Sequence, residues 1–301
     1  MIIQNKQIDF LKTITWFDVF NYPLQQNEIK TNFDLNNNVN NIQLEKGLYC
    51  LKDRGNLIDL RGKKEIIAKK LWEKINFWKW IFQITPFIKM VAVCNTLAFN
   101  NPDENSDIDL FIVTQNNRLF ISRTILTFLT SIFGLRRHGQ KTEKRFCLSF
   151  WITENALNLE NIQIKNNDPY LAFWCKTLKP IINKDNIYQK FLEINQRWIG
   201  ENDPCPCYNY PNKYFRPKKE FSIQDKKLIS KCSVLYSLFS MLNSILCHWQ
   251  LARCQIKMRN LNQNASVIVS KNMLKFHNVD MREFYKNKWL DIINLYKESK
   301  T

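Results

Sequence analysis

Two aspartates separated by a single residue stand at the start of an apolar run. Asp107 and Asp109 lead into the apolar residues 110–113, a pattern typical of a buried strand. Side chains along a strand alternate between its two faces, so both carboxylates are expected to point the same way. Neighbouring carboxylates repel each other, and burying them uncompensated costs free energy. Because a divalent cation removes that cost, the spacing predicts a site for Mg²⁺ or Mn²⁺ with Asp107 and Asp109 as ligands.

Polar residues suited to bind phosphate precede this pair. Residues 87–94 are rich in β-branched side chains and predict another buried strand, which ends at Asn95 and Thr96. The Thr96 hydroxyl can donate a hydrogen bond to a phosphate, and asparagine is one of the few residues that tolerate left-handed backbone angles. We therefore take Asn95, Thr96 and Ser106, which directly precedes the aspartates, as candidate nucleotide-binding residues.

Two arginines follow the aspartate strand closely. A helix is predicted over residues 118–133, and Gly134 is expected to end it. Arg118 and Arg123 on this helix are candidates for binding a triphosphate, and pairing with surface acids is an equally weighted alternative. A basic loop then leads to a third predicted strand over residues 145–152.

This order of elements resembles the nucleotidyltransferase superfamily that includes DNA polymerase beta and poly(A) polymerases. In that superfamily a Gly-Ser turn is followed after a short interval by an Asp-x-Asp strand; here Asn95-Thr96 and Asp107-Ile108-Asp109 occupy these places. The resemblance implies that Asp107 and Asp109 hold Mg²⁺ and that the turn holds the phosphates of a nucleoside triphosphate. It also implies a third carboxylate on a later strand, but residues 145–152 contain no acid, so the general base is unassigned.

The first sixty residues are expected to form a winged helix-turn-helix. Helical spacing in residues 8–20 and 25–33, a third helical piece over 40–46, and strands over 48–51 and 57–60 give the order of that unit. It could bind DNA through the third helix, or it could serve for dimerisation or docking.

The expected fold class is α+β, with a nucleotidyltransferase-like mixed sheet. We expect a winged-helix-like domain over residues 1–61, a linker helix over 62–84, the nucleotidyltransferase-like domain over 85–178 and a mainly helical domain over 179–301.

Positive charge is concentrated in the last third of the chain. The net charge is +17, of which residues 201–301 supply +9 from 17 basic and 8 acidic side chains. This excess indicates either a nucleic-acid-binding surface or the lysine-rich composition that an AT-rich genome favours. The densest group consists of Lys218, Lys219, Lys226, Lys227 and Lys231.

The nine cysteines are irregularly spaced, and the N-terminus has no signal-peptide pattern, so we expect reduced thiols in a cytoplasmic protein. The uncharged stretch between Lys231 and Arg253 is interrupted by serines and other polar residues. It therefore predicts a buried helix and no membrane span.

The leading interpretation is an enzyme that transfers a nucleoside monophosphate from a nucleoside triphosphate to an acceptor. The alternative is a catalytically degenerate regulator that binds nucleotide or nucleic acid without turnover. The retained Asp107–Asp109 pair favours the first, while Asn95 and the missing third carboxylate favour the second. A protein-interaction module has no positive signal in the sequence.

Overall fold

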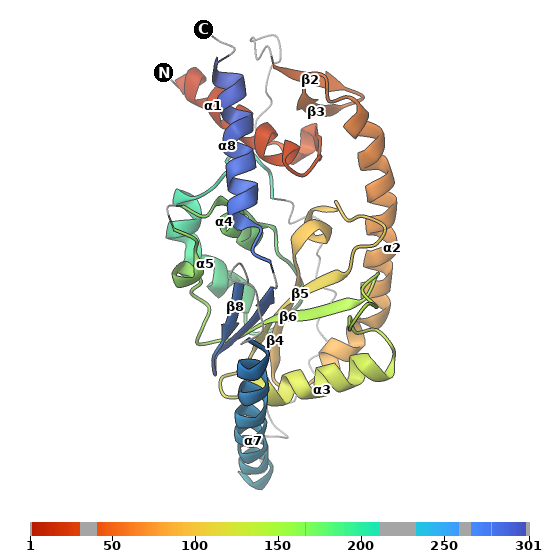
Figure 1. Ribbon diagram of the computed structural model, residues 1–301, viewed down its shortest axis with the longest axis vertical. Helices are drawn as coiled ribbons and strands as arrows, with labels where there is room; N and C mark the ends of the chain where they lie inside the picture. Colours follow the sequence, from red (N-terminus) through yellow and green to blue (C-terminus); the bar gives the residue numbers. More distant parts are fainter. Residues whose placement is uncertain are drawn as a thin grey trace.

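The apolar runs of the sequence form neighbouring strands at the centre of the protein. The computed structural model describes residues 2–30, 41–165, 167–210, 233–258, 266–277 and 279–298. The central strands are β4 (Ile88–Val93), β5 (Ile108–Thr114), β6 (Phe146–Thr153), β7 (Lys179–Asn183), β8 (Ser266–Val269) and β9 (Met273–His277). They form one six-stranded sheet in the order β7-β4-β5-β6-β9-β8 (Figure 1). Strands β5 and β6 are parallel and the other neighbouring pairs antiparallel, so the fold is α+β with a mixed sheet.

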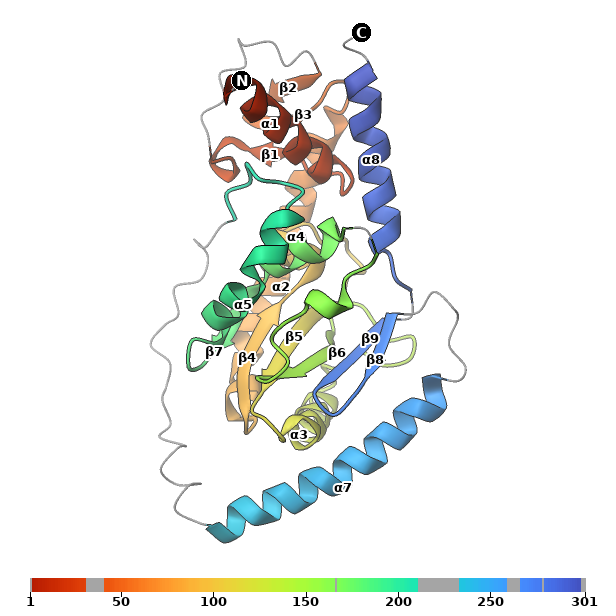
Figure 2. The ribbon, with the colours of Figure 1, turned by 90° about the vertical axis from the view of Figure 1, so that its left-hand side faces the viewer.

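The strand alternation supplies two separate hydrophobic cores, one on each face of this sheet. One core packs under α2 (Asn56–Ile84) and α3 (Leu119–Ile132), and it receives Leu110 and Ile112 from β5. The other packs under α4 (Pro169–Thr177) and α5 (Ile187–Glu201), and it receives Phe111 and Val113. The helix α7 (Ser233–Met258) runs beside α3 (Figure 2). Odd-numbered residues of the start of β5 therefore face α4 and α5.

The N-terminal unit combines one helix with a small antiparallel sheet. It contains α1 (Ile2–Asp18), β1 (Leu24–Gln25), the 3₁₀-helix η1 (Gln26–Glu28), β2 (Ile42–Glu45) and β3 (Leu48–Leu51), with strand order β1-β3-β2. The C-terminal helix α8 (Arg282–Glu298) packs along α1, where the rings of Trp16 and Trp289 meet edge to face at 5.4 Å (Figure 1).

Three of the expected elements in this unit differ from the structure. Residues 42–45 form a strand where we expected a helix, because Lys46 and Gly47 both adopt positive φ, at 50° and 78°, and make a tight hairpin turn between β2 and β3. Residues 57–60 belong to α2 where we expected a strand. The helix continues through Gly62, and Leu57, Ile58 and Arg61 lie on its buried face. The expected helix over 25–33 is β1 and η1 up to Glu28; residues 31–40 lie outside the described ranges.

The expected boundary at residue 178 runs through the sheet. Strand β7 pairs with β4, and β9 pairs with β6, so residues after 178 complete the sheet instead of forming a separate helical domain. The strands of this region are short and irregular in sequence, and the hydrophobic pattern alone did not reveal them.

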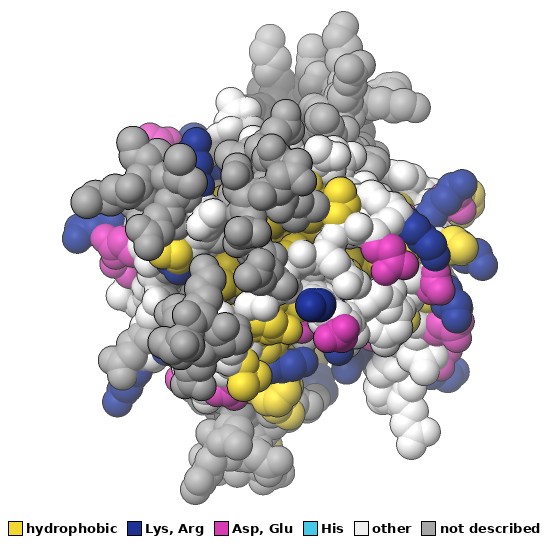
Figure 3. Space-filling view, turned by 90° about the horizontal axis from the view of Figure 1, so that it is seen from above, with side chains coloured by type: hydrophobic (Ala, Val, Ile, Leu, Met, Phe, Trp, Pro, Cys, Tyr) yellow, Lys and Arg dark blue, Asp and Glu magenta, His cyan; other side chains and the backbone are white. Residues whose placement is uncertain are grey.

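The face over the N-terminal unit carries charges of both signs. In the view from above, over the N-terminal unit, Lys and Arg side chains are interspersed with Asp and Glu (Figure 3). Arg54 of this unit pairs with Asp18 at 3.0 Å. The five lysines of the dense C-terminal group lie outside the described ranges.

Among the described helices, none has the length and apolar character needed to cross a membrane. The cysteines within the described ranges are free thiols.

Candidate active site

The two aspartates lie together on the face of the sheet that carries α4 and α5. Asp109 lies in β5 and Asp107 precedes it, so strand alternation directs both side chains to one face, as the spacing predicts. Strand β6 runs parallel to β5 and places Cys147 opposite Asp109. Ligand atoms of Asp107, Asp109 and Cys147 all lie within 4.8 Å of one another. Two carboxylates and a thiol at this spacing fit the donor set of a divalent metal ion.

The turn after β4 fixes one of these carboxylates. Asn95 begins the 3₁₀-helix η2 (Asn95–Phe99) with a φ of 58°, the left-handed conformation expected of it. Its side-chain nitrogen donates to Asp109 Oδ2 at 2.6 Å, and its oxygen accepts from Trp174 Nε1 at 3.0 Å. The amide is therefore held between α4 and β5, and it orients the Asp109 carboxylate. Thr96 lines the same cavity.

A basic residue that we did not predict completes the cluster. Arg137 donates from Nη1 to Asp107 Oδ2 at 2.6 Å and lies 3.7 Å from Cys147 Sγ. The loop between α3 and β6 holds it there, because the backbone N–H of Arg137 donates to the carbonyl of Phe146 at 2.9 Å. The sequence shows a basic loop at this point, but not which of its cations reaches the aspartates.

Burial and the neighbouring charge make Asp109 an unusual carboxylate. Burial raises the pKa of Asp109, and the charge of Asp107 raises it further, while the hydrogen bonds from Asn95 and Cys147 and the charge of Arg137 act in the opposite direction. Burial and the charge of Asp109 likewise raise the pKa of the Cys147 thiol to about 12. The cluster thus carries more negative charge than its surroundings compensate.

A cavity of about 290 Å³ opens beside the cluster. It is lined by Asn95, Thr96 and Asp109 and also by residues of β9, α8 and the segment that joins them. Lys275 of β9 lies opposite Phe150 of β6 in the strand register. It lines this cavity together with Arg282, so two cationic side chains border the space. Burial lowers the pKa of Lys275 to about 8. The cavity is therefore lined by one carboxylate of the pair, Asp109, together with Thr96 and Lys275.

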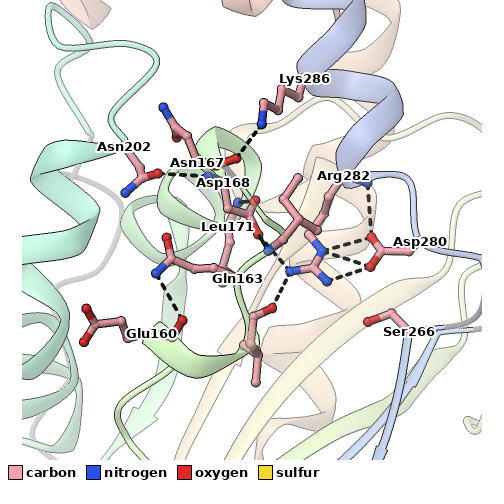
Figure 4. A network of polar contacts seen from close by, with 12 residues as sticks. Glu160, Gln163, Asn167, Asp168, Leu171, Asn202, Ser266, Asp280, Arg282 and Lys286 are labelled. Atoms are coloured by element: carbon pink, nitrogen blue, oxygen red, sulfur yellow. Dashed lines mark hydrogen bonds and ion pairs between the residues drawn. The ribbon is translucent and has the colours of Figure 1, made fainter.

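A buried ion-pair network holds the far wall in place (Figure 4). Asp168 is fully buried at the start of α4, and its carboxylate accepts from the backbone N–H of Leu171 and from that of Ile164. Arg282 at the start of α8 donates to Asp168 Oδ2 at 2.8 Å and to Asp280 Oδ2 at 2.6 Å. Burial alone would raise the pKa of Asp280, but hydrogen bonds from Arg282 and its charge lower it to about 2.

The two predicted phosphate-binding arginines do not reach this cavity. Arg118 and Arg123 belong to the α3 region, which covers the opposite face of the sheet. Arg118 is buried with its guanidinium 5.3 Å from the Phe87 ring, and Arg123 donates to Gln250 of α7. Both therefore lie on the α3 side of the sheet, away from the aspartates, because the face that a following helix covers cannot be read from sequence distance alone.

Ser106 also has a structural role. Its hydroxyl accepts a hydrogen bond from the backbone N–H of Asp103 at 2.8 Å and so shapes the loop before β5.

A larger cavity, of about 480 Å³, lies between the N-terminal unit and α2, and it contains none of the predicted site residues.

Comparison with protein-family models, with curated proteins and with solved structures finds no match to this chain.

Proposed function

We propose that this protein is a metal-dependent nucleotidyltransferase that moves a nucleoside monophosphate from a nucleoside triphosphate to an acceptor hydroxyl. The observation that carries the proposal is the convergence of Asp107 and Asp109 beside the Asn95–Thr96 turn, where Asp109 lines a cavity with both residues of the turn. Paired carboxylates on a rigid strand hold the divalent metal that phosphoryl and nucleotidyl transfer require.

Each part of the cavity has a role in this proposal. Asp107 and Asp109 hold the metal, and Asn95 fixes the Asp109 carboxylate in its orientation. When bound, the metal neutralises phosphate charge and lowers the pKa of the attacking hydroxyl. Thr96 and Lys275 both line the cavity, and in this proposal the hydroxyl and the amine bind phosphate oxygens. The general base remains unassigned, since no further carboxylate belongs to the cluster within the described residues.

The second candidate is a nucleotide-binding regulator without turnover. The ion pair between Arg137 and Asp107 favours it, because a guanidinium already supplies part of the compensating charge. In this case the cavity binds a nucleotide, and Arg137 stays in place. A nucleic-acid acceptor or ligand, bound through the lysine-rich segment 218–231, is compatible with either candidate.

One experiment separates the two. The purified protein is incubated with each of the four ribonucleoside triphosphates and Mg²⁺ or Mn²⁺, and pyrophosphate release and self-labelling are measured. Turnover that Asp107→Asn abolishes and Asp103→Asn leaves intact supports the enzyme, because Asp103 is an exposed acid outside the cavity. A triphosphate-dependent rise in melting temperature without pyrophosphate supports the regulator. If neither signal appears, or if Asp107→Asn leaves both unchanged, the site lies elsewhere.

A further inference from the structure

The sulfur of Cys147 lies where a third metal ligand would be. In β6 the preceding residue, Phe146, packs against Phe82 in the core under α2, so alternation turns Cys147 to the face of the carboxylates. Its pairing with Asp109 across the parallel strands brings Sγ within 4.8 Å of carboxylate oxygens of both aspartates. Within the described ranges, no other cysteine forms such a group with two acids.

A cation already bridges oxygen and sulfur at this point. The Arg137 guanidinium contacts Asp107 Oδ2 at 2.6 Å and Cys147 Sγ at 3.7 Å. The Arg137 side chain is 46% exposed, whereas that of Asp107 is 17% exposed, so the arginine can withdraw to solvent while the acid stays in place. The guanidinium thus marks a position where positive charge is accepted jointly by a carboxylate and a thiol.

We propose that Cys147 is a ligand of the metal in this site and that it makes the site selective for a borderline-soft divalent cation, of the Zn²⁺ and Co²⁺ class, over Mg²⁺. The inference rests on the metal site of the proposed function and specifies its occupant. Thiolates favour such metals, whereas Mg²⁺ prefers an all-oxygen octahedron that retains waters. On binding, the metal–sulfur bond replaces the S–H bond, the proton passes to solvent, and Arg137 moves away.

Cobalt reports this chemistry directly. Metal-free protein is titrated with Co²⁺, and thiolate ligation is expected to give a near-ultraviolet sulfur-to-cobalt charge-transfer band that Zn²⁺ removes by competition and excess Mg²⁺ does not. Cys147→Ser is expected to abolish the band and to weaken Co²⁺ binding by about tenfold or more, since loss of even an outer-shell partner weakens metal binding by that much. Cys207→Ser is the matched control, because Cys207 is a partly exposed thiol in the Cys205-Pro206-Cys207 pair, and it should leave the band unchanged.

A second variant keeps the proposal testable if the serine variant folds poorly. Cys147→Asp supplies oxygen in place of sulfur, so it should bind metal without the band and shift the preference toward Mg²⁺. A wild-type protein that shows no band, or one whose band survives in Cys147→Ser, overturns the inference.

These readouts need no nucleotide, so the two proposals can fail separately. If the band depends on Cys147 but no triphosphate is bound or turned over, only the proposed function fails. If Mg²⁺ supports turnover equally in the wild type and in Cys147→Ser, the proposed function stands and the inference about Cys147 is wrong.

Discussion

Two arginine–carboxylate groups flank the same cavity, and the negative charges of their carboxylates are balanced to very different extents. Asp168 is fully buried and its carboxylate accepts two backbone N–H groups and Arg282, which also binds Asp280. Asp107 and Asp109 share a single arginine, Arg137, whose side chain is 46% exposed. The pKa of Asp280 is lowered, whereas that of Asp109 is raised. The Asp168–Arg282–Asp280 group is a fully paired contact between α4 and α8. The Asp107–Asp109 group retains negative charge that a ligand can neutralise.

The largest effect on the free energy of unfolding should follow disruption of the Asp168–Arg282 ion pair. Asp168→Ala removes the partner of a buried guanidinium and the acceptor of two backbone donors, so it should lower the free energy of unfolding by about 3–5 kcal/mol. Urea denaturation measures this change. The control is Glu201→Ala, which removes the exposed Arg197–Glu201 pair and should change stability by less than about 0.5 kcal/mol. Equal effects of the two substitutions would contradict a structural role for the buried network.

In the cluster of Asp107, Asp109 and Cys147, removal of a carboxylate charge is expected to raise the stability of the protein. Because the pKa of Asp109 is raised on folding, its contribution to stability is present below about pH 4 and is lost as the pH rises through about 6. At higher pH the charged carboxylate costs free energy, so Asp109→Asn should stabilise the metal-free protein by roughly 1–2 kcal/mol. Thermal unfolding in a chelator measures this, with Asp103→Asn as the exposed control. A destabilised Asp109→Asn protein would show that Asp109 is as well compensated as Asp168.

These contrasts also show what could be read from the sequence. The strands over 88–93, 108–114 and 146–153 and the helix over 119–132 were predictable, because their hydrophobic patterns are local. The Asp107–Asp109 pair was predictable for the same reason. Arg137, Cys147 and Trp174 were not, because their contacts in the site join residues far apart in the chain. The Asp107–Arg137, Arg137–Cys147 and Asn95–Trp174 contacts span 30, 10 and 79 positions.

The missed parts of the fold have a similar cause. Strands β8 and β9 are short, and β9 joins the sheet by pairing with the edge of β6. Nothing in the sequence of β8 and β9 indicates this distant partner. Conversely, Arg118 and Arg123 looked close to the aspartates along the chain, but α3 crosses to the other face of the sheet.

A smaller effect should follow removal of the one arginine of the cluster. Arg137→Ala vacates the position that a metal would take, so it should increase metal affinity. The pair is partly exposed and is worth about 1 kcal/mol or less, which corresponds to a gain of about fivefold or less. Isothermal titration with Co²⁺ measures the change, and Arg136→Ala in the same loop is the control. Weaker metal binding in Arg137→Ala would mean that the arginine helps to build the site.

The smallest effect should come from Asp280 and should disappear in acid. The lowered pKa of Asp280 gives a contribution to stability that is present above about pH 4 and is lost as the pH falls through about 2. Asp280→Asn should therefore lower the melting temperature slightly near neutrality, and the difference from the wild type should disappear as the pH falls through about 2. A slope like that of Asp109, with stability rising toward low pH, would remove the distinction between the two groups.

The pairing of β6 with β9 has a consequence for how the protein is made. A ribosome releases the aspartates, Asn95 and Cys147 long before it releases Met273–His277 and α8, which supply the cavity wall and cover α1. Pairings so distant in the chain form slowly, because a long loop must close before any contact compensates for it. During synthesis the edge of β6 and the apolar face of α1 are therefore exposed together, and such surfaces favour aggregation until β9 and α8 have been synthesised.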